Sequence, residues 1–310
     1  MLLPTGSQRG DRYRCIRVSL FSSSLRCILS FSVLSPELNM AVSILLRFSV
    51  GLLATVGVVA NPILKARAVI AHDAVVGFAE AVPSGAVGNV YEAYQPFLYV
   101  VNGCVPFPAV NSAGNTGYVS HPPILNNAKF RSGGLATSGS SNGQCSSSPG
   151  QIYVRGTASN GRYAVMYSWC VSSPPPQPTS YMRNRYFPKD SPSSGLGHRH
   201  DWEGVIVWLS SATATTAANV LAVCPSAHGG WDCNTSFSLS GTGPLIKYES
   251  IWPVNHATDF TTTKGGQQPL IAWESLTAAA RTALENTDFG DAIVPFKDGT
   301  FAGNLAAATF

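Results

Sequence analysis

Acidic and imidazole side chains lie close together in one short run of the sequence, KDSPSSGLGHRHDWE, which contains Asp190, His198, Asp201 and Glu203. If a strand starts near Arg199, side chains two apart share a face, so Asp201 and Glu203 project to the same side. Two carboxylates about 7 Å apart at a strand end repel each other, which costs several kcal/mol unless they are paired. A cation would relieve this repulsion. The pattern therefore predicts a metal site formed by these four residues.

The donor types of this site indicate which metal it would take. Three carboxylates and one imidazole are mostly hard oxygen donors, which favours a divalent cation such as Mg²⁺, Ca²⁺ or Mn²⁺ over a structural Zn²⁺. We expect Mg²⁺ or Ca²⁺, with Zn²⁺ as an alternative, although the sequence contains neither HExxH nor Cys-x-x-Cys. A second alternative is an acidic cluster held by hydrogen bonds alone. His200 and Trp202 face the other way, and we expect them to pack and to support the site.

Two further residues are candidates for ligand contact. Trp252 and His256 lie in ESIWPVNHATDF, where Pro253 and Asn255 favour a turn. An exposed Trp beside polar groups often stacks on a sugar, but simple burial of Trp252 is an equal alternative. Trp208, inside VIVWL, is expected in the core.

The elements that must position these residues are mainly strands. Only 12% of residues are charged, and 29 Gly and 21 Pro favour many turns between short strands. One clear helix is predicted in SLTAAARTALEN, with Ser275 or Thr277 as its N-cap. We therefore predict an all-β fold, an antiparallel β-sandwich with a few covering helices. The predicted strands are PFLYVV, GQIYVRG, RYAVMYSW, EGVIVWL, NVLAVC and PLIKYESIW.

Cysteine positions predict two disulfides. Cys104 ends a strand-like run and Cys145 lies in a polar loop, so a bridge between them would tie that loop to the strand. Cys224 and Cys233 flank a Gly-Gly turn, which favours a local bridge. Asn234 begins an Asn-x-Ser sequon and is a candidate for glycosylation.

Residues 170–185, CVSSPPPQPTSYMRNR, interrupt the strand pattern with three consecutive prolines. Pro cannot continue a sheet ladder, so a surface loop is one interpretation. The other is a retained intron, because removing the segment takes out Cys170 and leaves an even number of cysteines after residue 60. Sequencing cDNA between Tyr167 and Asp190 tests this hypothesis, and finding only the longer form in secreted protein would refute it.

The first 60 residues are predicted to be absent from the mature domain. Residues 40–60 start at Met40 and form a secretory signal peptide, with an apolar run too short to span a membrane; an uncleaved anchor is the alternative. Residues 1–39 are interpreted as a non-native upstream extension, and 61–310 as one domain. Without the first 60 residues, basic and acidic residues balance, which gives no indication of nucleic-acid binding.

The heptapeptide GHRHDWE, preceded by MYSW and YFPKDSP, resembles the signature of the necrosis- and ethylene-inducing peptide 1-like proteins. AHDAVVGF, GCVPFPAV, GQIYVRG, WPVNHA and VPFKDGTF extend the resemblance over about 71–305. The second cysteine pair is similar to that of the four-cysteine type II subgroup, whose members are credited with a further calcium site. In relatives, the Trp before residues 170–185 runs straight into the Tyr after them.

The resemblance implies a secreted, plant-active cytolysin that is not an enzyme, with a fold related to actinoporins and fungal lectins. It implies binding to glycosylinositol phosphorylceramide sphingolipids of the plant plasma membrane at a divalent metal site. Asp190, His198, Asp201 and Glu203 match the family's metal residues, and Trp252 and His256 match its headgroup-contacting loop.

We therefore expect a secreted toxin that permeabilises the host plasma membrane. Two alternatives stay open: a non-toxic, lectin-like elicitor, and a metal-dependent enzyme acting on glycans, in which Asp201, Glu203 and His198 would supply acid and base.

Overall fold

The computed structural model describes residues 70–117, 135–171, 189–198, 200–250, 256–289 and 292–310. All described residues belong to one compact unit, Pro62–Phe310. The predicted upstream extension (1–39) and signal peptide (40–60) lie outside the described residues. Trp252 and residues 172–185 of the insertion also lie outside them.

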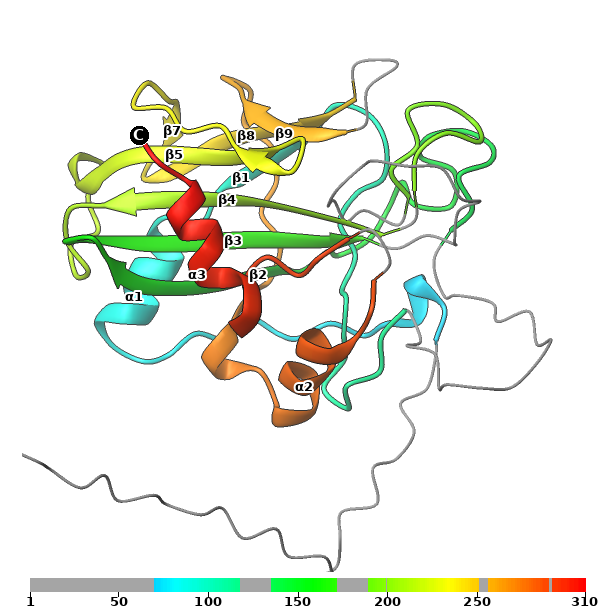
Figure 1. The fold of residues 1–310 in the computed structure, drawn as a ribbon, viewed down its shortest axis with the longest axis horizontal. Coiled ribbons are helices and arrows are strands. Elements are labelled where there is room, and N and C mark those ends of the chain that lie inside the picture. The colour runs from blue at the N-terminus through cyan, green and yellow to red at the C-terminus, as the bar shows by residue number, and fades with distance from the viewer. Residues whose placement is uncertain (1–69, 118–134, 172–188, 199, 251–255, 290–291) are drawn as a thin grey trace, which may run out of the picture. The chain divides into compact units, whose positions relative to one another are not determined.

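The larger sheet has six strands in the order β10-β2-β3-β4-β5-β6 (Figure 1). Its central strands are long and antiparallel, and they bury nearly all of their apolar side chains. The strands are β2 (Ile152–Ser159), β3 (Arg162–Val171), β4 (Asp201–Leu209), β5 (Val220–Ala227), β6 (Gly230–Trp231) and β10 (Leu270–Ala272).

The smaller sheet has four strands, with β8 paired to each of the others. They are β1 (Phe97–Val100), β7 (Leu239–Ser240), β8 (Gly243–Glu249) and β9 (Ala257–Phe260). Both sheets are mixed, because β1 pairs with β8, and β10 with β2, in parallel. The prediction of purely antiparallel pairing is therefore wrong for these two pairs. Each joins strands far apart in the chain, so no hairpin forces them to run in opposite directions.

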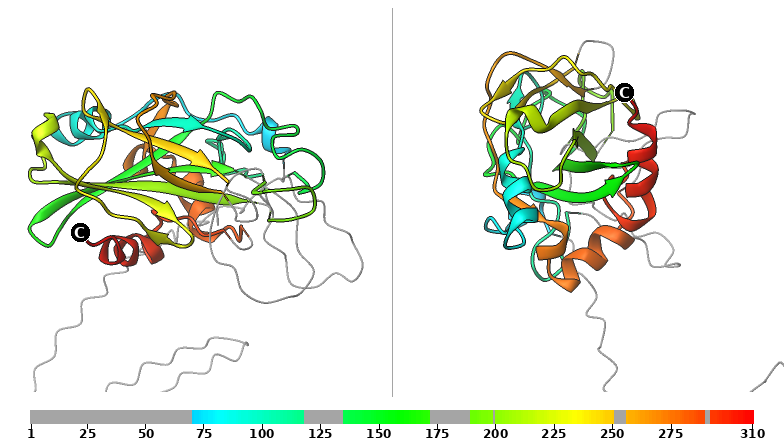
Figure 2. Two further views of the ribbon diagram at one scale, coloured as in Figure 1. Left: turned by 90° about the horizontal axis from the view of Figure 1, so that it is seen from above. Right: turned by 90° about the vertical axis from the view of Figure 1, so that its left-hand side faces the viewer.

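Among the described residues, three α-helices accompany the sheets: α1 (Ala86–Ala93), α2 (Ala278–Asn286) and α3 (Asp298–Ala307). Short 3₁₀ turns lie at His72–Ala74, Ala217–Asn219 and Trp273–Ser275. In Figures 1 and 2, α3 lies across one face of the larger sheet, and β1 and β8 lie on its other side. Within the described ranges, no helix is long and apolar enough to cross a membrane.

Only α2 was expected from the sequence. Glycines inside α1 and α3 lower their helix propensity, so tertiary packing must supply most of their stability. In α3, the buried Phe301 and Leu305 are four residues apart and therefore lie on one face of the helix.

Two tight hairpins fix the strand register of the larger sheet. Asn160 and Gly161 connect β2 to β3 with φ angles of 49° and 74°, and His228 and Gly229 connect β5 to β6 with 50° and 81°. Positive φ at both central residues is typical of a type I′ turn, whose twist matches that of the flanking strands.

Strand β4 occupies the middle of the larger sheet, between β3 and β5, and all nine of its residues are buried. Strand β3 continues two residues past Trp169, so that Cys170 lies opposite Trp202. Cys170 is buried and takes part in no disulfide, and its carbonyl accepts a hydrogen bond from the Phe107 N–H at 3.0 Å. Residues 170 and 171 therefore belong to the sheet, and the interpretation of 170–185 as a retained intron stays a prediction.

Both predicted disulfides are present. Cys104 pairs with Cys145, with Cα atoms 4.9 Å apart, and Cys224 pairs with Cys233, with Cα atoms 4.0 Å apart. Asn234 follows the second bridge and is exposed, so its side chain is accessible to a glycosyltransferase. Its glycosylation stays a prediction.

Replacing Thr277 with Ala should lower the free energy of unfolding by about 1 kcal/mol. The Thr277 hydroxyl caps α2 by accepting a hydrogen bond from the Ala280 N–H at 3.1 Å, and Ala cannot replace this acceptor. Urea unfolding measures the change. Thr282→Ala, in the interior of the same helix, is the control and should change stability by only a few tenths of a kcal/mol. Equal losses from both variants would contradict the cap.

Candidate functional site

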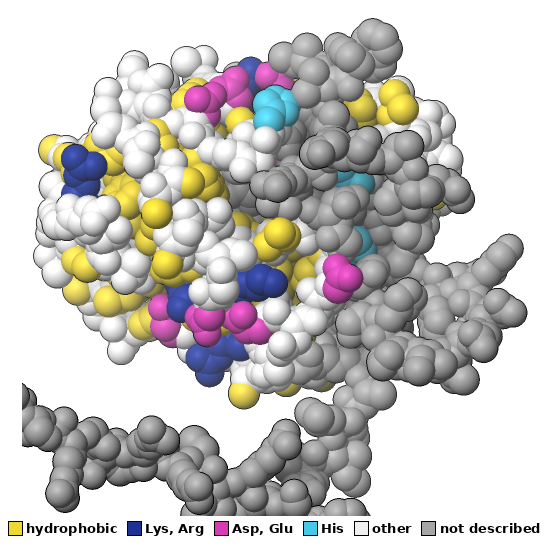
Figure 3. All heavy atoms as spheres, in the orientation of Figure 1, with side chains coloured by type: hydrophobic (Ala, Val, Ile, Leu, Met, Phe, Trp, Pro, Cys, Tyr) yellow, Lys and Arg dark blue, Asp and Glu magenta, His cyan; other side chains and the backbone are white. Residues whose placement is uncertain are grey.

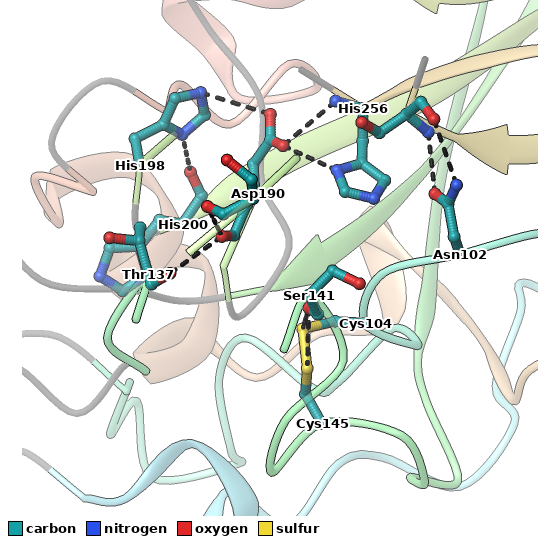
Figure 4. A network of polar contacts seen from close by, with 12 residues as sticks. Asn102, Cys104, Thr137, Ser141, Cys145, Asp190, His198, His200 and His256 are labelled. Carbon is teal, nitrogen blue, oxygen red and sulfur yellow. Dashed lines mark hydrogen bonds and ion pairs between the residues drawn. A yellow bond between two sulfur atoms is a disulfide. The ribbon is translucent and has the colours of Figure 1, made fainter. Parts of the chain in front are cut away.

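Asp190 and His198 form the base of a short loop (Figure 4). Their backbones exchange two hydrogen bonds, of 2.9 and 3.0 Å, as an isolated antiparallel bridge. Gly197 makes this closure possible. Its φ is +90°, and a Cβ atom at this position would lie 1.8 Å from the Asp190 carbonyl oxygen. Any other residue would strain the backbone and clash with Asp190.

The Asp190 carboxylate is fully buried and is held by His256. Oδ1 of Asp190 accepts hydrogen bonds from the His256 backbone N–H at 3.1 Å and from Nδ1 of its ring at 2.8 Å. Because an ionised carboxylate only accepts, Nδ1 must carry a proton. The ring is also fully buried and stacks on Tyr248, with centroids 4.8 Å apart. The structure thus places His256 as a support for Asp190, and its contact with a headgroup stays a prediction.

The second carboxylate oxygen of Asp190 faces His198. Oδ2 lies 3.6 Å from Nε2 of His198, which is too far for a hydrogen bond. Nδ1 of the same ring lies 3.2 Å from the His200 carbonyl, to which it can only donate. In the neutral ring, Nε2 would then present a lone pair toward a carboxylate oxygen. A proton on Nε2 would resolve this conflict, and so would a cation between the two atoms.

Asp201 and Glu203 begin β4 and are 0% and 1% exposed. They follow His198 by three and five residues, so they start the strand at the end where the loop closes. Ser226 on β5 donates a hydrogen bond to Oε2 of Glu203. The Ser226 hydroxyl also lies 3.1 Å from that of Thr258 on β9, so this contact links the two sheets.

The four predicted metal ligands lie within fourteen residues of one another in the sequence, and a direct contact is described for one pair of them, Asp190 and His198. Among the described residues, which exclude Arg199 and Trp252, no three His, Cys, Asp or Glu side chains converge in an arrangement suited to a metal. The metal and its full ligand set stay predictions.

His200 and Trp202 pack as expected from the sequence. His200 is 1% exposed and presents its ring to Phe289, with centroids 5.7 Å apart. Trp202 is 4% exposed and lies edge-to-face with Tyr153, Phe289 and Phe296. These contacts anchor the start of β4 from the side opposite Asp201 and Glu203.

Sequence reasoning missed two residues close to the site, one beside Asp190 and one beside His256. Lys189 is 2% exposed, and burial lowers the pKa of its ammonium group. Gly103 has a φ of +83°, and a Cβ atom there would lie 2.4 Å from Nε2 of His256. The only signals in the sequence are their positions beside Asp190 and Cys104. Figure 3 shows that charged side chains are few on the face shown, and that several basic and acidic side chains lie side by side near its upper and lower edges.

Comparison with known proteins identifies the family. A family model described as necrosis inducing protein (NPP1) matches residues 88–308. The chain belongs to this family. It is 44% identical over 249 residues to NLP effector protein 10 of Phytophthora capsici, covering 78% of this chain and 92% of that protein. It is 43% identical to necrosis-inducing protein NPP1 of Phytophthora nicotianae, and the match covers 78% of this chain and 91% of that protein.

Solved structures of NPP1-family members share the fold. A complex of NLPPya with mannosamine is 43% identical and has a TM-score of 0.64, covering 78% of this chain and all of that one. A glucosamine complex of the same protein has a TM-score of 0.63. The structure of the non-toxic HaNLP3 protein is 36% identical and also has a TM-score of 0.63. The match covers 77% of this chain and 98% of that one. The mainly stranded, two-sheet architecture is therefore that of the NPP1-family toxins.

Replacing Gly197 with Ala should disrupt the contact between Asp190 and His198. The backbone conformation alone costs about 1–2 kcal/mol, and the added methyl group would collide with the Asp190 carbonyl. We expect a lower melting temperature and changed His198 imidazole signals in NMR spectra. Gly195→Ala is the matched control, since its φ is +85° but nothing lies within 4 Å of its Cβ position. Equal effects from both substitutions would show that the close approach is unimportant.

Proposed function

We propose that this NPP1-family protein is a secreted toxin that binds a glycosylated sphingolipid headgroup and then permeabilises the plant plasma membrane. The binding site is formed by Asp190, His198, Asp201 and Glu203, with Trp252 as an additional contact. Glycosylinositol phosphorylceramide is the proposed lipid.

The observation that carries this proposal is the approach of Oδ2 of Asp190 to within 3.6 Å of Nε2 of His198, in a family of necrosis-inducing proteins. Two more buried carboxylates follow at the start of β4. Concentrated negative charge of this kind attracts a hard divalent cation. The complexes of the relative NLPPya with mannosamine and with glucosamine support a sugar-bearing ligand.

Each residue has a distinct role in the proposed site. Asp190, His198, Asp201 and Glu203 would hold Mg²⁺ or Ca²⁺, which would supply positive charge for sugar hydroxyls or phosphate oxygens. His256 fixes the Asp190 carboxylate by two hydrogen bonds, so that its other oxygen stays directed at His198. Ser226 holds the Glu203 carboxylate. These buried supports keep the acidic groups in place before any ligand arrives.

The two Phytophthora relatives are named as an effector and as a necrosis-inducing protein, which supports secretion and action on a host. We also propose that the two sheets form a sandwich related to actinoporins and fungal lectins, and that the protein catalyses no reaction. Its likeness to the non-toxic HaNLP3 protein favours one further candidate, a lectin-like elicitor that binds without lysis.

Co-sedimentation with lipid vesicles tests binding. Vesicles containing glycosylinositol phosphorylceramide should retain the protein in Mg²⁺ or Ca²⁺, whereas phosphatidylcholine vesicles or excess chelator should release it. Equal retention on both vesicle types would refute headgroup recognition. Release of sugar or phosphate from the bound lipid would instead identify an enzyme.

A further inference from the structure

Lys189, immediately before Asp190, is a buried cation whose partners are backbone carbonyl groups. Its ammonium group donates hydrogen bonds to the Ser138 carbonyl at 3.3 Å and to the Ser140 carbonyl. The side chain is 2% exposed. Burying a lysine is costly unless its charge is well compensated, so these contacts need an explanation beyond chance packing.

The two carbonyls belong to residues 137–145, which we call the cradle loop. Its end is fastened by the disulfide from Cys145 to Cys104 and by a hydrogen bond from the Val105 N–H to the Cys145 carbonyl at 2.9 Å. Cys104 follows Gly103, whose backbone lies against the ring of His256. The cradle loop is thus anchored beside the residue that supports Asp190.

Three more hydrogen bonds join the cradle loop to the residues after Asp190. The Thr137 carbonyl accepts from the Ser191 hydroxyl and from the Gly195 N–H, both at 2.9 Å. The Gly139 N–H donates to the Ser194 hydroxyl at 3.0 Å. Lys189 therefore fastens one side of Asp190 to the cradle loop, and residues 191–195 fasten the other.

We propose that Lys189 is a positioning residue, which clamps Asp190 to the cradle loop and so directs its carboxylate between His256 and His198. The inference rests on the proposed function only in assuming that Asp190 binds ligand. A direct contact between Lys189 and an anionic headgroup does not fit, because its ammonium group is buried and bonded to two carbonyls. Its effect on binding must pass through Asp190.

Substitution of Lys189 by Met tests this role, since Met keeps an unbranched stem and removes all three donors. Proton NMR of the full chain follows the His256 Nδ1–H signal, which the bond to Asp190 should shift downfield and protect from exchange. Lys189→Met should shift this signal or broaden it. Titration with Mg²⁺ alone should show a loss of affinity of about tenfold or more, as is typical when groups supporting metal ligands are removed.

Lys264→Met is the matched control, because Lys264 is exposed and packs on Phe97; it should leave both measurements unchanged. If Lys189→Met fails to fold, Ser191→Ala removes one cradle-loop bond and should move the His256 signal in the same direction. An unchanged His256 signal in a folded Lys189 variant, or in Ser191→Ala, would overturn the positioning role. If the parent protein binds neither Mg²⁺ nor the lipid, the proposed function is rejected. A shift of the His256 signal in Lys189→Met would in that case still support the positioning role of Lys189.

Discussion

Leakage of vesicles containing plant sphingolipid should be abolished when Asp201 is replaced by Asn. Asn keeps the shape and one carbonyl oxygen but removes the charge that a hard divalent cation needs. The fold should survive, because relief of repulsion with Glu203 offsets the lost contacts of the carboxylate. In chelator, the melting temperatures of parent and variant should therefore be similar, and the rise on adding metal should shrink in the variant.

Asp298→Asn is the matched control for this variant. Asp298→Asn also removes a negative charge, but Asp298 lies on α3, away from the start of β4. Its side chain is 70% exposed and forms an ion pair with Arg155. It should leave leakage unchanged. If Asp201→Asn unfolds the protein, the acidic pair is structural. If leakage and the metal response are both unchanged, the proposed site is wrong.

Truncation of Trp202 to Ala should produce the largest loss of stability, about 3–5 kcal/mol. The indole is 4% exposed and lies against three aromatic rings, those of Tyr153, Phe289 and Phe296. Because Trp202 separates Asp201 from Glu203 in the sequence, loosening its anchor should also displace both carboxylates. A large fall in the urea midpoint is therefore expected together with reduced metal affinity.

Two substitutions calibrate this effect. Trp202→Phe keeps an aromatic ring in the cluster and should lose much less stability than Trp202→Ala. Phe310→Ala removes a ring that is 40% exposed at the C-terminus and should cost little. A cost for Trp202→Ala close to that of Phe310→Ala would show that the aromatic cluster does not hold the start of β4.

The sequence predicted the strand that carries the acidic pair because β4 combines a period of two with a strongly apolar run. The assignment of Trp202 and His200 to packing followed from the same alternation. His200 itself is not in the strand, since β4 begins at Asp201 and the φ of His200 is +61°. Helix α2 was predictable from its Ala- and Leu-rich interior and its Thr277 cap, whereas α1 and α3 were hidden by internal glycines.

Long-range contacts were not predictable in the same way. His256 reaches Asp190 from 66 residues away, and nothing in ESIWPVNHATDF shows that the ring is buried against a carboxylate. The burial of Lys189 depends on backbone carbonyl groups of the cradle loop. Every residue has such a group, so the pattern of side chains does not show which ones bind a lysine. The parallel pairing of β1 with β8 likewise depends on the course of the whole chain.

Dye release from lipid vesicles tests the central claim most directly. The parent protein should release dye from vesicles containing glycosylinositol phosphorylceramide in the presence of Mg²⁺ or Ca²⁺. Release should stop in excess chelator, resume when the metal is restored, and be absent from vesicles made of phosphatidylcholine alone. Equal release with and without either the sphingolipid or the metal would contradict a metal-dependent toxin that recognises this headgroup.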